Sequence, residues 1–243
     1  MEKRMESGVD RPSRTRHDEI VRHHFTGMEI SITEEVSALG AFIESVERKS
    51  IRVERSRQVV FDALSGNIRA MMAERGLDLE RLPGERNIRS LRRFYWKISV
   101  DPTKTRPSSE ALARRLLRKG LPTINSLVDA GNLASVETLV PLGIYDSERI
   151  AGALTLRMSE PGEHFIGIDG SRSTLESPVP VLADEKDIIH LYPYRDGRRT
   201  RITFETKSVI AVACGVEGMR GEDLGPALER IWSYNEALGG GER

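Results

Sequence analysis

The sequence predicts an α+β fold with mixed or antiparallel strands and several packed helices. Apolar residues recur at every fourth position within residues 56–75, which is typical of an amphipathic helix. Short apolar segments separated by turn residues fill residues 152–216, and the run VIAVACGV at 209–216 has the length of a buried strand. Helices that precede a group of strands in this way favour an α+β domain.

The first 27 residues are polar and show no hydrophobic periodicity. We therefore expect residues 1–27 to form a flexible tail and residues 28–243 to form a single α+β domain. Residues 28–36 are typical of a first strand, and the β-branched residues of 40–53 indicate one or two more.

Helix 56–75 is expected to bury a stripe formed by Val60, Leu64, Ile68 and Met72. A Pro-Gly pair within residues 79–87 predicts a break after it.

A second helix is expected at 107–119. Ser108 is suited to the N-cap, Glu110 lies in the first turn, and Gly120 is suited to the position that ends the helix. The residues expected to face inward are Leu112, Leu116 and Leu117.

A third helix is expected at 123–138, with a turn at 140–146 after it. Its apolar face is expected to contain Ile124, Leu127, Val128 and Gly131. The remaining strands are predicted at 152–157, 164–169, 187–193, 201–205 and 209–216, with hairpin turns at 160–163 and 195–199, before a closing helix at 223–237.

Composition excludes several classes of protein. Cys214 is the one cysteine, so an internal disulfide and a cysteine-based zinc site are both excluded. No apolar run is long enough to cross a membrane, and no early segment has the pattern of a signal peptide. His23 and His24 lack a third ligand nearby, so we expect no metal and no cofactor. We expect a cytoplasmic protein.

Positive charge is concentrated in one part of a chain whose formal net charge is zero. Residues 81–120 contain twelve arginines and lysines but three acidic residues. The helix dipole accounts for one or two cations at the end of helix 107–119. The motif RRFYW at 92–96 adds aromatic side chains, which RNA-binding proteins use for stacking. The alternative is that Phe94, Tyr95 and Trp96 pack in the core while the arginines only solubilise the surface.

The region that follows resembles a known family. The motifs are DPTKTRPSSEALARRLL from residue 101, LPTINSLVDAGNLAS from residue 121 and PLGIYD from residue 141. In combination they resemble the B3/B4 domain, the tRNA-editing domain of the phenylalanyl-tRNA synthetase β subunit, and more closely its free-standing versions. The resemblance covers about residues 90–215.

The resemblance implies an α+β fold and a role near aminoacyl-tRNA. We expect a protein that binds tRNA or another RNA and that acts in trans as a deacylase of mischarged tRNA. A non-catalytic RNA-binding module and a binder of an amino-acid-like small molecule remain as alternatives. We do not expect a synthetase subunit, because the other domains of that subunit do not fit within 243 residues.

The sequence departs from the synthetase pattern at the pocket. Gly143 stands where the family has a histidine, and YPYRDGRRTR at 192–201 replaces a glycine-rich segment, whereas Asn132 matches. Pro141 and Gly143 are therefore the expected pocket residues, and we expect a preference for aminoacyl groups other than tyrosine.

Hydrolysis of an activated ester needs a positioned water rather than a nucleophilic side chain. The catalytic candidates are Asn132, to orient the substrate, and Asp129 or Glu205, to hold the water; simple structural hydrogen bonds or a salt bridge are the alternatives. The candidates for RNA contact are Arg92, Arg93, Lys104, Arg106, Arg114, Arg115, Arg118, Lys119, Arg198, Arg199 and Arg201.

Overall fold

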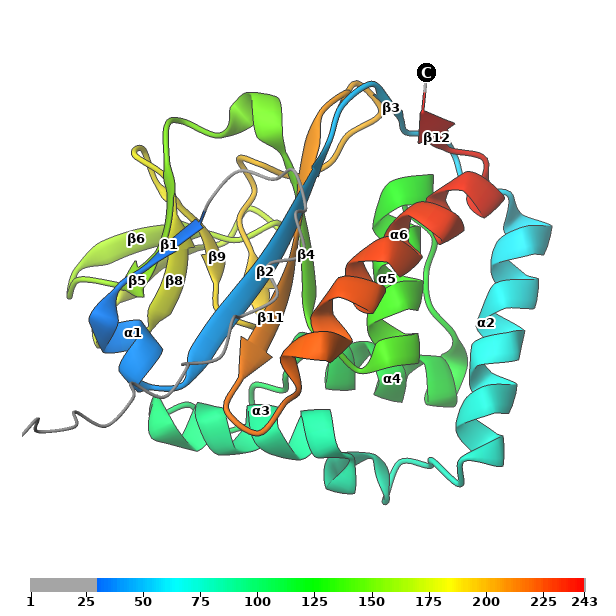
Figure 1. Cartoon of the computed structure of the whole chain (residues 1–243), viewed down its shortest axis with the longest axis horizontal. Coiled ribbons are helices and arrows are strands. Elements are labelled where there is room, and N and C mark those ends of the chain that lie inside the picture. The colour runs from blue at the N-terminus through cyan, green and yellow to red at the C-terminus, as the bar shows by residue number, and fades with distance from the viewer. Residues whose placement is uncertain (1–29, 243) are drawn as a thin grey trace, which may run out of the picture.

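The computed structural model describes residues 30–242. A three-stranded sheet runs through the middle of the molecule, with helices α2, α4, α5 and α6 on one side and a second sheet on the other, while α3 runs along the lower edge (Figure 1). One contiguous core contains buried residues from the helices and from both sheets. The α+β prediction is confirmed.

The central sheet has the order β2-β11-β4, and both pairings are antiparallel. Strand β2 spans Ala41–Arg48, β11 spans Val209–Val216 and β4 spans Leu142–Asp146. Every residue of β11 is buried because both of its faces and both of its edges are covered. A strand covered on all sides needs a continuous apolar sequence, so the prediction from the VIAVACGV run is confirmed.

The second sheet has the order β1-β5-β8-β9-β10. Its first pair is parallel and the others are antiparallel. Its strands are β1 (Ile30–Ile32), β5 (Leu154–Met158), β8 (Pro180–Ala183), β9 (Ile188–Leu191) and β10 (Arg195–Asp196). Two smaller antiparallel pairs complete the strands: β6 (Glu163–Ile166) with β7 (Arg172–Leu175), and β3 (Ile51–Arg52) with β12 (Gly241–Glu242).

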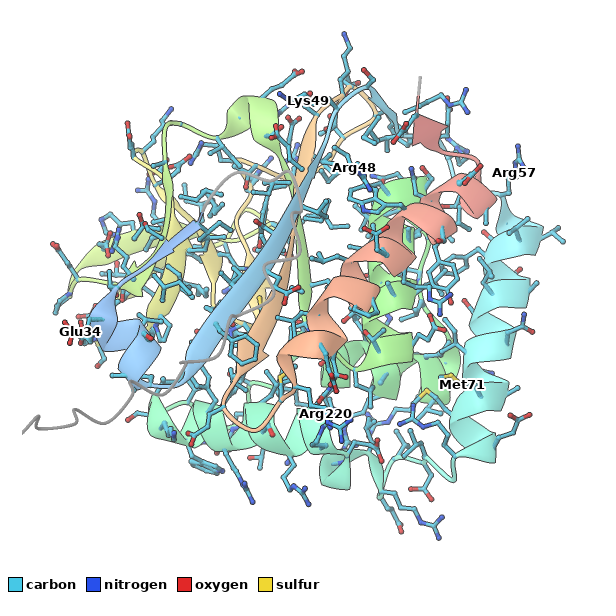
Figure 2. All side chains as sticks on the ribbon, viewed as in Figure 1. Glu34, Arg48, Lys49, Arg57, Met71 and Arg220 are labelled. Carbon is cyan, nitrogen blue, oxygen red and sulfur yellow. The ribbon has the colours of Figure 1, made fainter. Side chains whose placement is uncertain are left out.

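Helix α5 is the most enclosed helix of the layer, since it packs against α2, α4, α6 and β4. Figure 2 shows side chains filling the space between α2 and the other helices, with Met71 among them. The helices are α1 (Glu34–Ala38), α2 (Gln58–Glu74), α3 (Arg86–Lys97), α4 (Ser108–Lys119), α5 (Ser126–Thr138) and α6 (Leu224–Leu238). Short 3₁₀ turns lie at Leu82–Gly84, Ser147–Arg149 and Gly221–Asp223.

The helices predicted at 56–75, 107–119 and 223–237 are confirmed, as are the strands predicted within 40–53. Gly120 ends α4 with a φ of 86°, a conformation that glycine adopts without steric cost. The predicted N-cap is wrong by one residue, because Pro107 occupies that position. Ser108 instead donates a hydrogen bond from its Oγ to the carbonyl oxygen of Pro193, at 3.3 Å.

Other predictions are wrong for reasons of tertiary contact. Residues 140–146 do not form only a turn, since most of them form β4, which pairs with β11. Residues 201–205 alternate like a strand but lie in a loop, and Phe204 there is 51% exposed. The two predicted hairpin turns are also wrong. The strands on either side of residues 160–163 do not pair with each other, and residues 195–199 are not only a turn because Arg195 and Asp196 form β10. Ile124 is 57% exposed and precedes α5, so it is not on the apolar face of that helix.

The predicted tail and the histidine pair at 23 and 24 lie outside the described residues. The extent of the single domain from residue 28 therefore stays a prediction. Within residues 30–242, no helix combines the length and the apolar character that a membrane span requires.

Candidate nucleic-acid interface

A hollow of about 300 Å³ lies beside α4 and the loop that precedes it. Six cationic side chains and one alanine line it: Lys104, Arg106, Ala111, Arg114, Arg115, Arg118 and Lys119. We call this hollow and its rim the α4 basic surface. The structure thus brings together six of the cations that the sequence marked for RNA contact.

The six cations of the α4 basic surface are not equivalent. Arg106, Arg115, Arg118 and Lys119 are exposed and make no ion pair with a described residue. Arg114 lines the same hollow but has a side chain that is only 14% exposed, because it bonds to Glu110. The exposed cations are therefore free to meet an anionic partner, whereas Arg114 already has one.

Glu110 is the link between α3 and α4. Its carboxylate is fully buried and accepts hydrogen bonds from Arg92 at 2.8 and 2.7 Å and from Arg114 at 2.7 Å. The two arginines lower the pKa of Glu110 below its usual value, because their hydrogen bonds and charges outweigh the opposing effect of burial. Arg92 and Arg114 thus carry a structural role that sequence reasoning did not assign to them.

Helix α3 carries a further cation and an aromatic ring on its exposed face. Phe94 and Tyr95 are buried, but Trp96 is 61% exposed and Arg93 on the same helix is also exposed. The interpretation that all three aromatic residues of RRFYW pack in the core is therefore correct for two of them and wrong for Trp96. An indole ring left in solvent beside cations is suited to stacking on an unpaired base.

The remaining predicted cations lie elsewhere. Arg198, Arg199 and Arg201 line a separate cavity, which shares no lining residue with the α4 basic surface. Arg199 already forms an ion pair with Asp184. The two carboxylate oxygens of Asp184 lie 2.7 and 2.6 Å from Nη2 of Arg199. The structure therefore divides the predicted RNA-binding set into two sites.

Asp129 and Asn132 lie on α5, on the helical side of the central sheet. Asp129 is fully buried, accepting from Ser56 Oγ at 2.5 Å and from the backbone NH of Ile124 at 2.9 Å. Burial raises the pKa of Asp129, and the two hydrogen bonds oppose that shift. Asn132 is half-buried, and its amide makes no hydrogen bond with another described residue.

Gly143 lies on the opposite face of β4 from α5. The next residue, Ile144, points toward α5, since a Cβ on Gly131 would lie 2.7 Å from Ile144 Cδ1. A Cβ on Gly143 would lie 2.1 Å from the hydroxyl oxygen of Tyr145, so the phenol occupies the space beside this glycine. The absence of a side chain at Gly143 is thus what lets Tyr145 lie along the strand.

Tyr145 belongs to a polar cluster that sequence reasoning missed, in which Tyr145 and His190 are buried and the side chain of Asp196 is 40% exposed. Its hydroxyl donates to Asp196 Oδ1 at 2.9 Å and lies 2.7 Å from His190 Nδ1, which is 2.8 Å from the same carboxylate oxygen. Burial raises the pKa of Tyr145 well above its usual value. Tyr145 was visible in the PLGIYD motif, but its partners come from β9 and β10, which no local signal connects to it.

The other two candidates come from outside α5. Pro141 is buried, and its carbonyl accepts from the backbone NH of Cys214 at 2.9 Å. Glu205 is exposed in the 201–208 loop, and a hydrogen bond from Thr203 lowers its pKa. The roles of these residues and of Asn132, Asp129 and Gly143 in catalysis stay predictions.

Comparison with known proteins agrees with the motifs. The family model described as the B3/4 domain matches residues 90–223. The chain belongs to the B3/4 domain family. Every residue that the sequence singled out for catalysis, for the pocket or for RNA contact lies within this B3/4 domain match.

The curated relatives are phenylalanine–tRNA ligase β subunits. The one from Rhodopseudomonas palustris is 34% identical over 111 residues, which are 46% of this chain and 14% of the relative. The one from Cutibacterium acnes is 33% identical over 104 residues, which are 43% of this chain and 12% of the relative. The chain therefore spans a small part of the length of these relatives. A solved amino-terminal fragment of the phenylalanyl-tRNA synthetase β subunit from Pyrococcus horikoshii aligns with 89% of this chain and 52% of its own, at 15% identity and a TM-score of 0.42.

The Glu110 cluster leads to a prediction about stability. Glu110→Gln should lower the free energy of unfolding at pH 7 by about 3 kcal/mol, because it leaves two largely buried guanidinium groups without their counter-ion. The folded-state pKa of Glu110 lies below its unfolded value, so this stabilisation is complete above the unfolded pKa and is lost as pH falls through the folded value. Urea unfolding at pH 7 and at acidic pH measures both effects.

The matched control is Glu222→Gln, which removes an exposed carboxylate that lies 3.5 Å from Arg220. Its effect should stay within about 0.5 kcal/mol at either pH. Equal stability of the wild type and the Glu110 variant at pH 7 would contradict the role given to this carboxylate.

Proposed function

We propose that this B3/4 domain protein binds tRNA through the α4 basic surface. The observation that carries the proposal is the lining of the hollow. Six cations and one alanine line it, and none of the lining residues is acidic. RNA presents a dense row of phosphates, and cations that are held close together without acidic partners match that row. The names of the phenylalanine–tRNA ligase relatives favour tRNA among the RNAs.

The local structure fixes the backbone that carries these cations before any ligand arrives. The side chain of Asp101 accepts from the backbone NH of Thr103 at 2.8 Å and from its hydroxyl at 2.7 Å, which shapes the loop that carries Lys104 and Arg106. Arg115, Arg118 and Lys119 are spaced three and four residues apart on α4, so they share one face. A preformed surface loses less conformational entropy on binding.

Trp96 favours RNA over a simple anion as the partner. Its ring is largely exposed on α3, which Glu110 joins to α4 through Arg92. Stacking of a base on an exposed aromatic ring stabilises single-stranded RNA complexes by roughly 1–3 kcal/mol. Cations for phosphates and a ring for a base together fit a structured RNA with unpaired nucleotides.

Replacing Arg115, Arg118 and Lys119 together with glutamine should weaken tRNA binding and leave the fold intact. Glutamine keeps a good helix-forming side chain, while each lost phosphate contact reduces the slope of log affinity against log salt by about one unit. Filter binding of a purified phenylalanine tRNA over a range of salt concentrations measures affinity and slope together. Arg114 is left unchanged because it holds Glu110.

The control replaces three other exposed cations with glutamine: Lys49, Arg55 and Lys207. Lys49 and Arg55 lie outside the B3/4 match, and Lys207 is far along the chain from α4. This control removes the same charge and should keep the affinity and salt slope of the wild type. If the α4 cations served only to balance the helix dipole, their loss would lower stability slightly and leave tRNA binding unchanged. Equal affinity and slope in all three proteins would refute the proposal.

A second candidate function is hydrolysis of the aminoacyl ester of mischarged tRNA, in trans. Asn132 supports it, because its amide is partly exposed, has no described hydrogen-bond partner and matches the asparagine that the synthetase presents near its pocket. An amide free of other bonds can orient the carbonyl of an ester while water attacks it. Because Gly143 replaces the family histidine, the expected substrates carry an amino acid other than tyrosine.

A panel of mischarged tRNAs tests this second function. We expect at least one aminoacyl-tRNA to be deacylated faster than its spontaneous rate, and Asn132→Ala to remove the acceleration while leaving tRNA affinity unchanged. Asn67→Ala, at an exposed asparagine on α2, is the matched control and should keep full activity. If the protein binds tRNA but hydrolyses no member of the panel, the deacylase function is excluded and the protein is an RNA-binding module.

A further inference from the structure

A second and larger cavity, of about 540 Å³, lies between the β6–β7 pair, β9 and the loop after β10. Five arginines and one carboxylate contribute to its lining. A strongly cationic cavity of this size lies within the range typical of small-molecule sites. Three of its arginines belong to the basic run at 198–201, and the fold brings Arg149 and Arg172 to the same cavity.

Two of the five arginines already have acidic partners. Arg199 is bonded to Asp184 and lies 3.4 Å from Asp187, the carboxylate of the lining. Arg149 lies 3.3 Å from Asp146, which is almost fully buried. These two arginines therefore brace the wall of the cavity and contribute little free charge.

The other three arginines have no such partner. Arg172 on β7 and Arg198 and Arg201 after β10 make no ion pair with any residue in 30–242. Three guanidinium groups that face one cavity repel one another unless an anion lies between them. Guanidinium forks bind phosphate oxygens in pairs, which makes a phosphate group a well-matched occupant.

The turn between β6 and β7 is shaped to receive one of these arginines. Gly170 has a φ of 84°, and a Cβ built on it would lie 2.5 Å from Nη1 of Arg198. A residue with a side chain would be strained at this φ and would push the guanidinium away. Gly170 thus leaves room at this turn for the exposed guanidinium of Arg198.

The cavity also has an apolar side. Ile166 is 43% exposed and Ile188 is nearly buried, and both line the cavity. Exposed isoleucine beside cations is suited to a ligand with a flat, weakly polar body in addition to its charge. His164 in the same lining adds a ring that can donate or accept a hydrogen bond.

We propose that this cavity binds a nucleotide, with its phosphate between Arg172, Arg198 and Arg201 and its base or sugar against the isoleucines. The ligand is either a free nucleoside monophosphate or the terminal nucleotide of a bound RNA, since both present the same phosphate and base. The second source rests on the proposed tRNA-binding function, and the first does not.

Isothermal titration calorimetry of the full chain with AMP tests the site, with adenosine and inorganic phosphate as partial ligands. AMP should bind about tenfold or more tightly than either fragment, because only AMP uses both sides of the cavity. Replacing Arg172, Arg198 and Arg201 together with glutamine should weaken AMP binding by about tenfold or more. All three side chains line the surface of the cavity, and unchanged thermal unfolding of the variant checks that the fold is kept.

The control is the triple glutamine variant of Lys49, Arg55 and Lys207, which should bind AMP as the wild type does. Absence of AMP binding, or equal AMP binding by the cavity variant and the wild type, would overturn the proposal. Equal affinity for AMP and inorganic phosphate would overturn the proposal of a nucleotide site, because the cavity would then recognise only the phosphate group. These outcomes do not depend on tRNA, so the site and the proposed function fail separately.

Competition distinguishes the two sources. If the cavity holds the terminal nucleotide of an RNA, saturating AMP should weaken tRNA binding by the wild type, and the cavity variant should lose this effect. If the cavity holds a free nucleotide, tRNA affinity should be the same with and without AMP.

Discussion

The buried carboxylate of Glu110 is the constraint on which the cationic surface depends. It is fully enclosed and bonded to Arg92 of α3 and Arg114 of α4, so it fixes how these two helices meet. A lone buried carboxylate would be strongly destabilising, and two guanidinium partners make it tolerable. As a consequence, the arginines of this region have two different roles. Those that face inward hold the helices together, and those that face outward remain free for a partner.

The balance of charge in the whole chain hides this arrangement. The sequence has 37 basic and 37 acidic residues, yet eleven of the cations line two hollows that share no lining residue. One hollow is open along a helix and suits an extended row of phosphates. The other lies among strands and suits a compact ligand with one phosphate. Net charge is therefore a poor guide to partners when its distribution is uneven.

The face of β4 that carries Gly143 illustrates how a family scaffold is altered. A glycine in place of a histidine does not leave an empty space here, because the Tyr145 phenol lies beside it and reaches His190 and Asp196. Asn132 lies on α5, which packs against the other face of the same strand.

Local signals in the sequence were sufficient for α2, α4 and α6, where the spacing of apolar residues matches the helical period. They were not sufficient for β4, because Pro141 and Gly143 are typical of a turn and only pairing with β11 makes this segment a strand. They also gave no helix for Arg86–Lys97, where four arginines interrupt the apolar residues and burial of Phe94 and Tyr95 decides the structure. For the site, the cations of 104–119 were predictable because they are close in sequence. The burial of Glu110 and the separate cavity of Arg198 were not, because both depend on contacts between distant segments.

Amide hydrogen exchange with and without saturating tRNA tests the central claim most directly, because it locates the bound surface without altering any residue. We expect slower exchange in residues 101–119 and around Trp96 when tRNA is bound, with little change in the exposed turns of α2. Slower exchange confined to other segments, with 101–119 unchanged, would contradict the claim that the α4 basic surface binds RNA.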